Sequence, residues 1–386
     1  MKVFLIAGEP SGDRLGGALM GGLRQLLPDQ IHFDGVGGEF MQSQGLQSRF
    51  PMEELSVMGL VEILPKYFHF KRRIREMADL IVETKPDVLI TIDSPEFCLR
   101  VAKLVKAKSQ IRTVHYVAPT VWAWRPGRAE KMARHIDHVL ALFPFEPPYM
   151  EAAGMQCDFV GHPVVTEPQA SESEALEFRQ RYAIGDSPMA LVLPGSRGSE
   201  VTRLGPIFAE TVKRVQDQRD GVHFVVPAAR PVAGLVEEMV RDWKGQVTVL
   251  DPRDLSTEDA QIEKRAAFRA ADVALAASGT VSLELAAAGT PMVIAYDMNW
   301  LSRQIITRML RTDTATLVSL VSETRVIPEF LGKDCQPQWI AAALLDTLDS
   351  PQDQVEAMRL TMQRLGAGGE PPGLRAARAV LNGLGR

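Results

Sequence analysis

Cysteine is scarce in this sequence, with three residues in a chain of 386, at Cys98, Cys157 and Cys335. None of the three belongs to a C-x-x-C pair or shows the spacing of a metal-ligand set. An odd and sparse set of cysteines excludes a disulfide framework and is typical of a protein in a reducing compartment. We therefore expect the chain to fold on its hydrophobic cores, with no structural metal.

The sequence also lacks a long uncharged hydrophobic run and a strong net charge. The apolar run at the N-terminus ends at Gly8, which is too short for a signal peptide and predicts a first β-strand instead. No uncharged run approaches the length of a transmembrane helix. A formal net charge of −5 provides no general attraction to nucleic acid or anionic lipid, so we expect no nucleic-acid partner and only local membrane contacts.

The pattern of hydrophobic residues predicts an α/β protein with more than one domain. At 386 residues the chain is too long for one ordinary core. Short apolar runs alternate with longer amphipathic segments, which predicts parallel sheets covered by helices on both faces. The predicted strands are 2–7, 87–92, 113–117 and 138–143 in the first half, and 189–193, 223–226, 247–250, 273–276 and 292–295 in the second.

A polar stretch over 166–173, without strand character, separates the two series and is the best candidate for an interdomain linker. We expect an N-terminal domain over 1–165 and a C-terminal domain over 174–365, each a doubly wound Rossmann-like sheet. Two such domains would face a central cleft at the carboxyl ends of their strands. After a glycine- and proline-rich break, we expect 366–386 to pack back on the N-terminal domain or on a partner subunit.

The loop 194–200, Pro-Gly-Ser-Arg-Gly-Ser-Glu, is a candidate phosphate site in the second half. It follows a predicted strand and opens a predicted helix, so that bare N–H groups, the helix dipole and the Arg197 guanidinium would surround an anion. A tight turn whose glycines only solve a backbone problem is about equally compatible with the loop alone. The loop alone therefore does not distinguish an anion-binding site from a tight turn.

A second loop of the same kind follows a later predicted strand. Its residues Ser278, Gly279 and Thr280 could hydrogen-bond a diphosphate, and Glu284 could accept hydrogen bonds from the two hydroxyls of a ribose. Alternatively, Thr280 is an N-cap and Glu284 compensates the helix dipole. Taken with Ser196 and Arg197 from the first loop, the pattern favours a nucleotide site.

Two further features of the first half could carry chemistry. Asp93 follows a predicted central strand, where it could act as a general base on an alcohol or cap a helix whose start Pro95 favours. An aromatic-rich stretch over 115–125 ends another predicted strand. There, Trp122 could shape a sugar or acyl pocket and Arg125 could reach an anionic group, although tryptophans in such clusters more often belong to the local core.

Large apolar side chains and cations are mixed over 57–75. This pattern is typical of a helix that lies in an anionic membrane interface. A core helix with a solvated basic face would give a similar pattern. The residues that we expect at the interface are Leu60, Ile63, Leu64, Phe68, Lys71, Arg72 and Arg73.

A series of motifs, spread over nearly the whole chain and in the same order, resembles the lipid-A-disaccharide synthase family. The motifs lie at 8–13, 53–59, 93–97, 121–125, 143–146, 161–163, 193–197 and 278–284. The resemblance implies a GT-B fold and an inverting glycosyltransferase of Gram-negative bacteria that needs no cofactor. It also implies a cytoplasmic protein, peripheral on the cytoplasmic face of the inner membrane.

The same resemblance implies the substrates. The donor would be UDP-2,3-diacylglucosamine and the acceptor 2,3-diacylglucosamine 1-phosphate (lipid X), giving the β-1,6-linked lipid A disaccharide 1-phosphate and UDP. The N-terminal domain would face the membrane and the acceptor, the C-terminal domain would bind the UDP-sugar, and a homodimer could exchange C-terminal segments. A UDP-sugar 2-epimerase-like enzyme and a non-catalytic UDP-binding membrane scaffold are the alternatives.

The resemblance also implies roles for single residues. Asp93 matches the proposed general base of the family, and Arg197 and Glu284 match residues of its UDP site. Glu9 and Ser11 are candidates on the acceptor side of the cleft, together with Trp122 and Arg125.

Three positions depart from the family pattern. Glu96 keeps the charge of the usual aspartate, whereas Cys98 replaces an asparagine. Ser319 stands where many members carry an asparagine that contacts the nucleotide, and its hydroxyl could still hydrogen-bond with a shorter reach.

Overall fold

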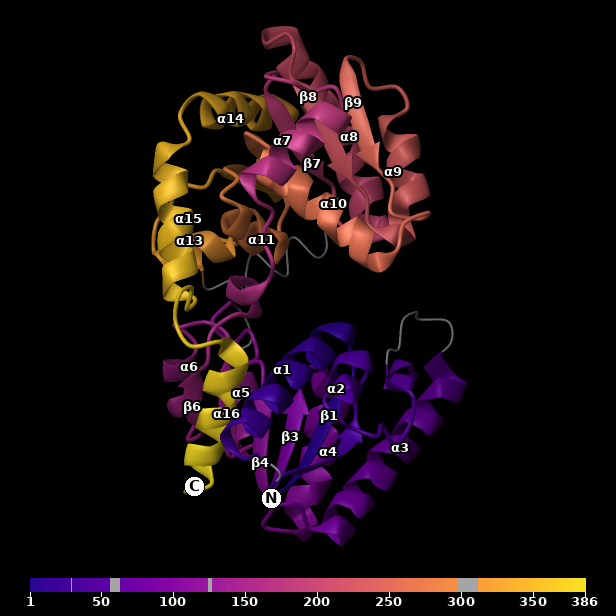
Figure 1. Ribbon diagram of the computed structural model, residues 1–386, viewed down its shortest axis with the longest axis vertical. Coiled ribbons are helices and arrows are strands. Elements are labelled where there is room, and N and C mark those ends of the chain that lie inside the picture. Colours follow the sequence, from indigo (N-terminus) through magenta and orange to yellow (C-terminus); the bar gives the residue numbers. More distant parts are fainter. Residues whose placement is uncertain (29, 56–62, 124–126, 298–311) are drawn as a thin grey trace. The chain divides into compact units, whose positions relative to one another are not determined.

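The computed structural model describes the chain except for residues 29, 56–62, 124–126 and 298–311, and it describes 63–67 without their side chains. The described residues form two compact units (Figure 1). The first consists of Met1–Thr166 and Leu365–Arg386, and the second of Glu167–Arg364.

The first unit contains a six-stranded parallel sheet in the order β2-β1-β3-β4-β5-β6. The strands are β1 (Lys2–Ala7), β2 (His32–Val36), β3 (Val88–Ile92), β4 (Arg112–Tyr116), β5 (His138–Ala141) and β6 (Gln156–Phe159). The central strand β3 is buried along its length, as expected where helices cover both faces of a parallel sheet.

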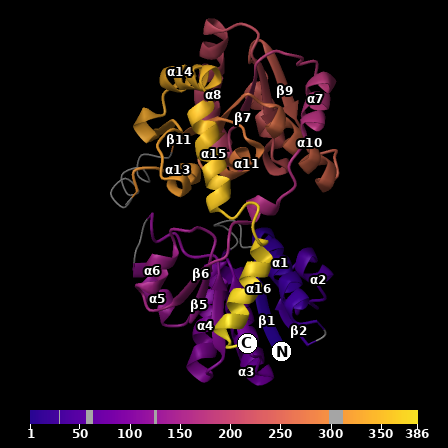
Figure 2. The same cartoon turned by 60° about the vertical axis from the view of Figure 1, so that its left-hand side comes forward.

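The helices of the first unit include the C-terminal one. They are α1 (Pro10–Leu26), α2 (Glu39–Ser43), α3 (Ile63–Thr84), α4 (Pro95–Lys108), α5 (Gly127–Ala133), α6 (Pro147–Glu151) and α16 (Pro372–Gly383), with 3₁₀ turns at Met52–Leu55 and Pro163–Thr166. Figure 2 shows α16 beside α1. The two helices approach closely because glycines face each other: a Cβ on Gly22 would lie 2.6 Å from the Gly373 carbonyl oxygen. The C-terminal segment thus belongs to the first unit.

The second unit contains another six-stranded parallel sheet, in the order β12-β11-β10-β7-β8-β9. Its strands are β7 (Met189–Leu193), β8 (His223–Pro227), β9 (Gln246–Leu250), β10 (Val273–Ala277), β11 (Met292–Tyr296) and β12 (Glu329–Leu331). Its helices are α7 (Glu172–Arg181), α8 (Gly198–Gln218), α9 (Ala233–Val240), α10 (Thr257–Ala270), α11 (Val281–Ala288), α13 (Leu317–Ser322), α14 (Pro337–Asp349) and α15 (Gln352–Arg364), with 3₁₀ turns at Arg230–Val232 and Gly332–Asp334. One sheet face carries a hydrophobic core covered by α8, α9 and α14, in which Phe208 and Phe224 are fully buried.

Every predicted strand is present, with ends shifted by at most two residues. Three strands were not predicted: β2, β6 and β12, each at an edge of its sheet. Polar residues interrupt the apolar pattern of the first two, as Asp34 and Asp158 do. The third has only three residues.

Each sheet has a point where its winding reverses. In the first unit the chain runs from β1 outward to β2 and then returns to β3 on the other side of β1. In the second it runs from β7 through β8 to β9 and then returns to β10 on the other side of β7. Doubly wound sheets bind ligands beyond the carboxyl ends of the strands at such a point. We therefore expect ligand sites at the loops after β1 and β3 in the first unit, and at the loops after β7 and β10 in the second.

Candidate functional site

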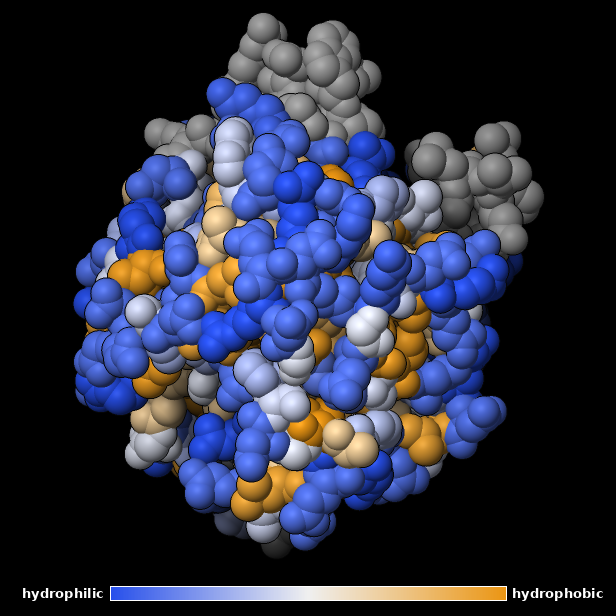
Figure 3. All heavy atoms as spheres, turned by 90° about the horizontal axis from the view of Figure 1, so that it is seen from above, coloured by the Kyte–Doolittle hydropathy of each residue, from blue (hydrophilic) through white to orange (hydrophobic). Residues whose placement is uncertain are grey.

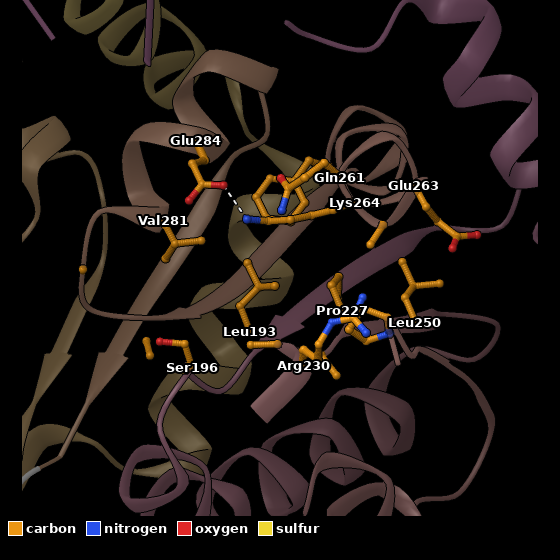
Figure 4. A pocket seen from close by; sticks show the side chains of 18 of the residues that line it. Leu193, Ser196, Pro227, Arg230, Leu250, Gln261, Glu263, Lys264, Val281 and Glu284 are labelled. Atoms are coloured by element: carbon orange, nitrogen blue, oxygen red, sulfur yellow. Dashed lines mark hydrogen bonds and ion pairs between the residues drawn. The ribbon is translucent and has the colours of Figure 1, made fainter. Parts of the chain in front are cut away.

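A cavity of about 660 Å³ opens in the second unit where β7 and β10 end (Figure 4). Its size is within the range of small-molecule sites. The loops after β7 and β10 form part of the wall, and the loops after β8 and β9 and helix α10 form the rest. The predicted nucleotide-binding residues that line it are Ser196, Arg197, Ser278, Gly279, Thr280 and Glu284. The structure thus brings the two predicted loops together.

The loop after β7 is held by a carboxylate from its own helix. Glu200 accepts hydrogen bonds from the backbone N–H groups of Ser196, at 3.0 Å, and Arg197, at 3.2 Å, and from Arg197 Nη1, at 3.2 Å. Gly195 has φ of +111°, and a Cβ there would lie 2.4 Å from Glu200 Oε2, so the close approach requires glycine. The expectation that these N–H groups are bare is therefore wrong, because Glu200 occupies two of them.

Arg197 itself is the exposed cation of this loop. Its side chain is 78% exposed, whereas that of Glu200, with which it forms an ion pair at 3.2 Å, is 16% exposed. Because an ion pair formed by so exposed a guanidinium is weak, Arg197 can leave Glu200 and bind another anion. The guanidinium can therefore offer two parallel N–H donors to a phosphate.

The loop after β10 leads into α11 without a side-chain cap. Thr280 occupies the N-cap position, but its hydroxyl makes no capping hydrogen bond. By position, Thr280 is therefore the N-cap and Glu284 a first-turn acid, as the alternative interpretation has it, but the Thr280 side chain does not cap the helix. Gly279 and Thr280 are exposed at the cavity, where the N-terminus of α11 favours negative charge.

Glu284, on the first turn of α11, pairs with a lysine that the sequence analysis did not single out. Lys264 Nζ, from α10, lies 2.5 Å from Glu284 Oε2. Arg230 is a second unpredicted cation of the wall, and its guanidinium donates to the carbonyl oxygens of Arg253, at 2.9 Å, and Leu255, at 2.7 Å. Lys264 lies inside a helix, and the loop of Arg230 after β8 contains no glycine or serine, so neither cation showed the loop motif.

Ser319 does not join this group. It lies on α13, it is fully buried, and it is not among the residues that line the cavity. Its hydroxyl has no hydrogen-bond partner within the described parts of the chain. In this structure Ser319 is therefore a buried residue of α13 outside the cavity lining, and its contact with a nucleotide stays a prediction.

In the first unit, the loops after β1 and β3 meet at the switch point. A Cβ on Gly8 would lie 2.5 Å from Ser94 Oγ, so the two loops are in close contact. Asp93 and Ser94 both have left-handed backbones, with φ of +51° and +43°. Such conformations are strained for residues other than glycine and cluster at functional sites.

Asp93 is half-buried, and its backbone N–H donates to the Tyr116 carbonyl oxygen at 3.0 Å. No hydrogen bond to its carboxylate occurs among the residues described. The N-cap of α4 is Ser94 rather than Asp93, and it makes no side-chain capping bond. The alternative that Asp93 caps this helix is therefore wrong, and its carboxylate is available to accept a hydrogen bond or a proton from a ligand.

Glu9 and Ser11 lie at the start of α1, and both are exposed. Burial raises the pKa of the Cys98 thiol, and the nearby charges of Asp93 and Glu9 act in the same direction. Glu9 and Asp93 follow β1 and β3, which are neighbours in the sheet, so both lie at this end of it. Glu96 instead faces solvent and pairs with Arg100 at 2.7 Å within α4.

Trp122 belongs to an aromatic cluster after β4 and β5. Its indole Nε1 donates to Glu146 Oε1 at 3.3 Å, and its ring packs edge-on against Phe145, with centroids 5.1 Å apart. Glu146 is buried and accepts from the N–H groups of Leu142 and Phe143, and burial raises its pKa to about 7. Arg125 lies outside the described residues.

The expected membrane-interface residues fall on and before α3. Leu60 lies outside the described residues, and Ile63 and Leu64 are described only as backbone. Phe68 is 69% exposed, and Lys71 and Arg72 are exposed. None of the helices that the structure describes combines the length and the hydrophobicity of a transmembrane span.

Arg73 does not belong with these outward cations. Its guanidinium lies 2.9 Å from a Glu54 carboxylate oxygen and 3.1 Å from one of Glu76, and 4.5 Å from the centroid of the Phe50 ring. Only 24% of its side chain is exposed. Arg73 is thus paired with two carboxylates and partly buried, so the structure favours it less than Lys71 and Arg72 for the predicted membrane contact.

The remaining described surface shows neither a continuous hydrophobic patch on the face in view nor a metal-binding group. On the face seen in Figure 3, hydrophilic residues predominate and hydrophobic ones are scattered among them, as is usual for protein surfaces. No group of three or more His, Cys, Asp or Glu side chains is arranged to hold a metal ion in the segments that the structure covers.

Known proteins resemble this chain over most of its length. A family model described as lipid-A-disaccharide synthetase matches residues 3–372. A lipid-A-disaccharide synthase of Ruegeria pomeroyi is 63% identical over 384 residues, which cover 100% of this chain and 96% of the relative.

Solved structures share the fold at low sequence identity. The UDP-GlcNAc 2-epimerase of Neisseria meningitidis bound to UDP-GlcNAc has a TM-score of 0.62 at 11% identity, covering 100% of this chain and 99% of the other. MurG of Acinetobacter baumannii has a TM-score of 0.54 at 15% identity, with the same coverage. At these identities the structures show a shared GT-B fold and nothing finer about the site.

Proposed function

This chain belongs to the lipid-A-disaccharide synthase family and is a glycosyltransferase of the GT-B fold, and we propose that it joins UDP-2,3-diacylglucosamine to lipid X. The products would be the β-1,6-linked lipid A disaccharide 1-phosphate and UDP, with inversion at the anomeric carbon. The observation that carries this proposal for the site is the cavity at the β7–β10 switch point, which gathers an exposed guanidinium, an uncapped helix start and a first-turn carboxylate.

The cavity of the second unit would hold the UDP part of the donor. The Arg197 guanidinium and the N-terminus of α11 at Ser278–Thr280 would bind the diphosphate. The Glu284 carboxylate would accept hydrogen bonds from ribose hydroxyls. As the sugar leaves, negative charge grows on the diphosphate, and donors already aimed at it lower the barrier.

Asp93 of the first unit would act as the general base. It would remove the proton of the acceptor 6-hydroxyl while that oxygen bonds to the anomeric carbon, and the bond from this carbon to the UDP oxygen breaks. The half-buried carboxylate, without a hydrogen bond from the described residues, and its strained backbone support this role. Glu9, Ser11 and Trp122 would lie on the acceptor side.

Acylated substrates require contact with a membrane. We propose that the chain binds the cytoplasmic face of the inner membrane peripherally, through the start of α3 with Phe68, Lys71 and Arg72. The exposure of these side chains supports the proposal. A homodimer that exchanges α16 would form the α1–α16 contact between two chains instead of within one.

Product analysis by mass spectrometry tests the function. The full chain is incubated with UDP-2,3-diacylglucosamine, with and without lipid X. We expect the disaccharide 1-phosphate only when both are present. An epimerase would convert the donor alone, and a non-catalytic scaffold would consume nothing; either result contradicts the proposal.

A further inference from the structure

Lys264 and Glu284 lie side by side in the wall of the cavity, although they are 20 residues apart and belong to different helices. Lys264 is on α10, and Glu284 is on the first turn of α11. Their charged ends lie 2.5 Å apart, and Figure 4 shows the two side chains reaching toward each other. The contact therefore links Glu284, the residue proposed to bind the ribose, to the neighbouring helix α10.

The Glu284 carboxylate has one oxygen engaged and one oxygen open. Oε2 accepts from Lys264, and no other hydrogen bond to this carboxylate is formed within the described part of the chain. To accept from ribose hydroxyls, the carboxylate must keep its lone pairs aimed at the ligand. Because a free glutamate side chain has many rotamers, a partner that holds one of them reduces the entropy lost on binding.

A second contact holds the Lys264 side chain in place. Its Nζ lies 5.1 Å from the centroid of the Phe268 ring, one turn further along α10, which is within the range of a cation–π interaction. The Lys264 side chain is 31% exposed and that of Glu284 36%. A pair this exposed contributes little to the stability of the fold, so its placement is better explained by the cavity that it faces.

We propose that Lys264 is a positioning residue for ribose recognition. It holds the Glu284 carboxylate toward the cavity, so that the site prefers a ribonucleotide to a deoxyribonucleotide. This inference rests on the nucleotide site proposed above. A different role for Lys264, direct contact with the diphosphate, would leave the preference for ribose unchanged, so the two roles are separated by changing the sugar.

The test compares the binding of UDP and 2′-deoxy-UDP to the full chain by isothermal titration calorimetry. The wild type should bind UDP more tightly, and Lys264→Met should reduce this preference about tenfold, since it removes the partner that orients the carboxylate. Lys264→Arg should retain most of the preference because a guanidinium can still donate to Oε2. Lys213→Met, which removes an exposed lysine of α8 away from the cavity lining, is the matched control and should change nothing.

A double-mutant cycle completes the test. Glu284→Gln should also remove the preference, and Lys264→Met in that background should cause no further loss, because Lys264 acts through Glu284. Equal weakening of both nucleotides by Lys264→Met, or no change in either, overturns the role of Lys264 while leaving the nucleotide site intact. A folded wild-type chain that binds neither nucleotide contradicts the nucleotide site, and this inference with it. Circular dichroism checks that each variant is folded.

Discussion

The two units reverse their winding at corresponding points of their sheets, but the loops found there carry different chemistry. Between β1 and β3 of the first unit, the loops present the carboxylates of Glu9 and Asp93. Between β7 and β10 of the second, they present the Arg197 guanidinium and the uncapped start of α11 beside a cavity. One topology thus serves a candidate base in one unit and a candidate anion site in the other, which shows that the loop side chains carry the chemistry.

The backbones of these loops differ in the same sense. After β7, the positive φ is taken by Gly195, for which it is unstrained, and Glu200 closes the turn. After β3, two non-glycine residues, Asp93 and Ser94, take left-handed conformations, and Ser94 lies directly against Gly8. Strain of this kind persists only where the surroundings enforce it. The loop after β3 is therefore built to aim one side chain, and the loop after β7 leaves room for a ligand.

The largest effect is expected from Asp93→Ala. Turnover should fall about 10³-fold, because a general base typically contributes that order of rate. UDP affinity should stay unchanged, because the cavity of the second unit is untouched. Steady-state kinetics and calorimetry measure the two quantities. Glu96→Gln is the control, since Glu96 faces solvent and pairs with Arg100. An Asp93→Ala variant with most of its activity would exclude the residue as the base.

The converse experiment is Arg197→Ala. The turnover number should fall about 10²-fold, because a donor aimed at the developing charge of the leaving group is lost. Unlike Asp93→Ala, this variant should also bind UDP more weakly. Arg203→Ala, an exposed arginine of α8 that does not line the cavity, should behave as wild type. Unchanged UDP affinity and unchanged turnover in Arg197→Ala would remove the guanidinium from the site.

The sequence predicted the central strands and the loops that follow them, because a buried parallel strand such as β3 or β7 is a nearly continuous apolar run. It missed three of the four edge strands, β2, β6 and β12, where polar residues or short length hide the pattern, and found only the edge strand β9. It also could not predict the order of the strands, which decides that the loops after β7 and β10 become neighbours.

Contacts between elements that are distant in the sequence explain the residues that were missed or misplaced. Lys264 reaches the cavity only through the packing of α10 beside α11, which no local motif records. Glu200 was part of the predicted loop, but its use as a cap depends on the turn at Gly195. Ser319 was chosen from its position in the family pattern, and the local fold buries it.

A buried carboxyl group in the first unit gives the two units a different pH dependence of stability. Burial raises the pKa of Glu146 from an ordinary 4.5 to about 7, so between these values the folded state keeps a proton that the unfolded state has released. The first unit should therefore lose about 2 kcal/mol of stability as the pH rises from about 5 to about 7. Glu146→Gln should remove this dependence.

Hydrogen exchange read by mass spectrometry measures this difference in each unit separately. Peptides that cover β5 should show the pH-dependent difference between wild type and Glu146→Gln, and peptides that cover β10 should not. Glu151→Gln, an exposed glutamate on α6, is the matched control. The same pH dependence in the variant as in the wild type would mean that Glu146 does not titrate in this range.

The smallest effects are expected on α3, which would give the first unit a membrane contact. Lys71→Gln and Arg72→Gln should each weaken binding to vesicles that contain anionic lipid about fivefold, because each surface cation contributes about 1 kcal/mol. Arg73→Gln on the same helix is the matched control and should weaken it less. The Arg73 side chain is only 24% exposed and is held by Glu54 and Glu76, whereas that of Arg72 is 63% exposed and has one longer ion pair, 3.4 Å from Glu76. Phe68→Ser should weaken binding to neutral vesicles as well, since its contribution does not depend on lipid charge. Equal losses for all three cations would indicate general charge attraction instead of a defined face of α3.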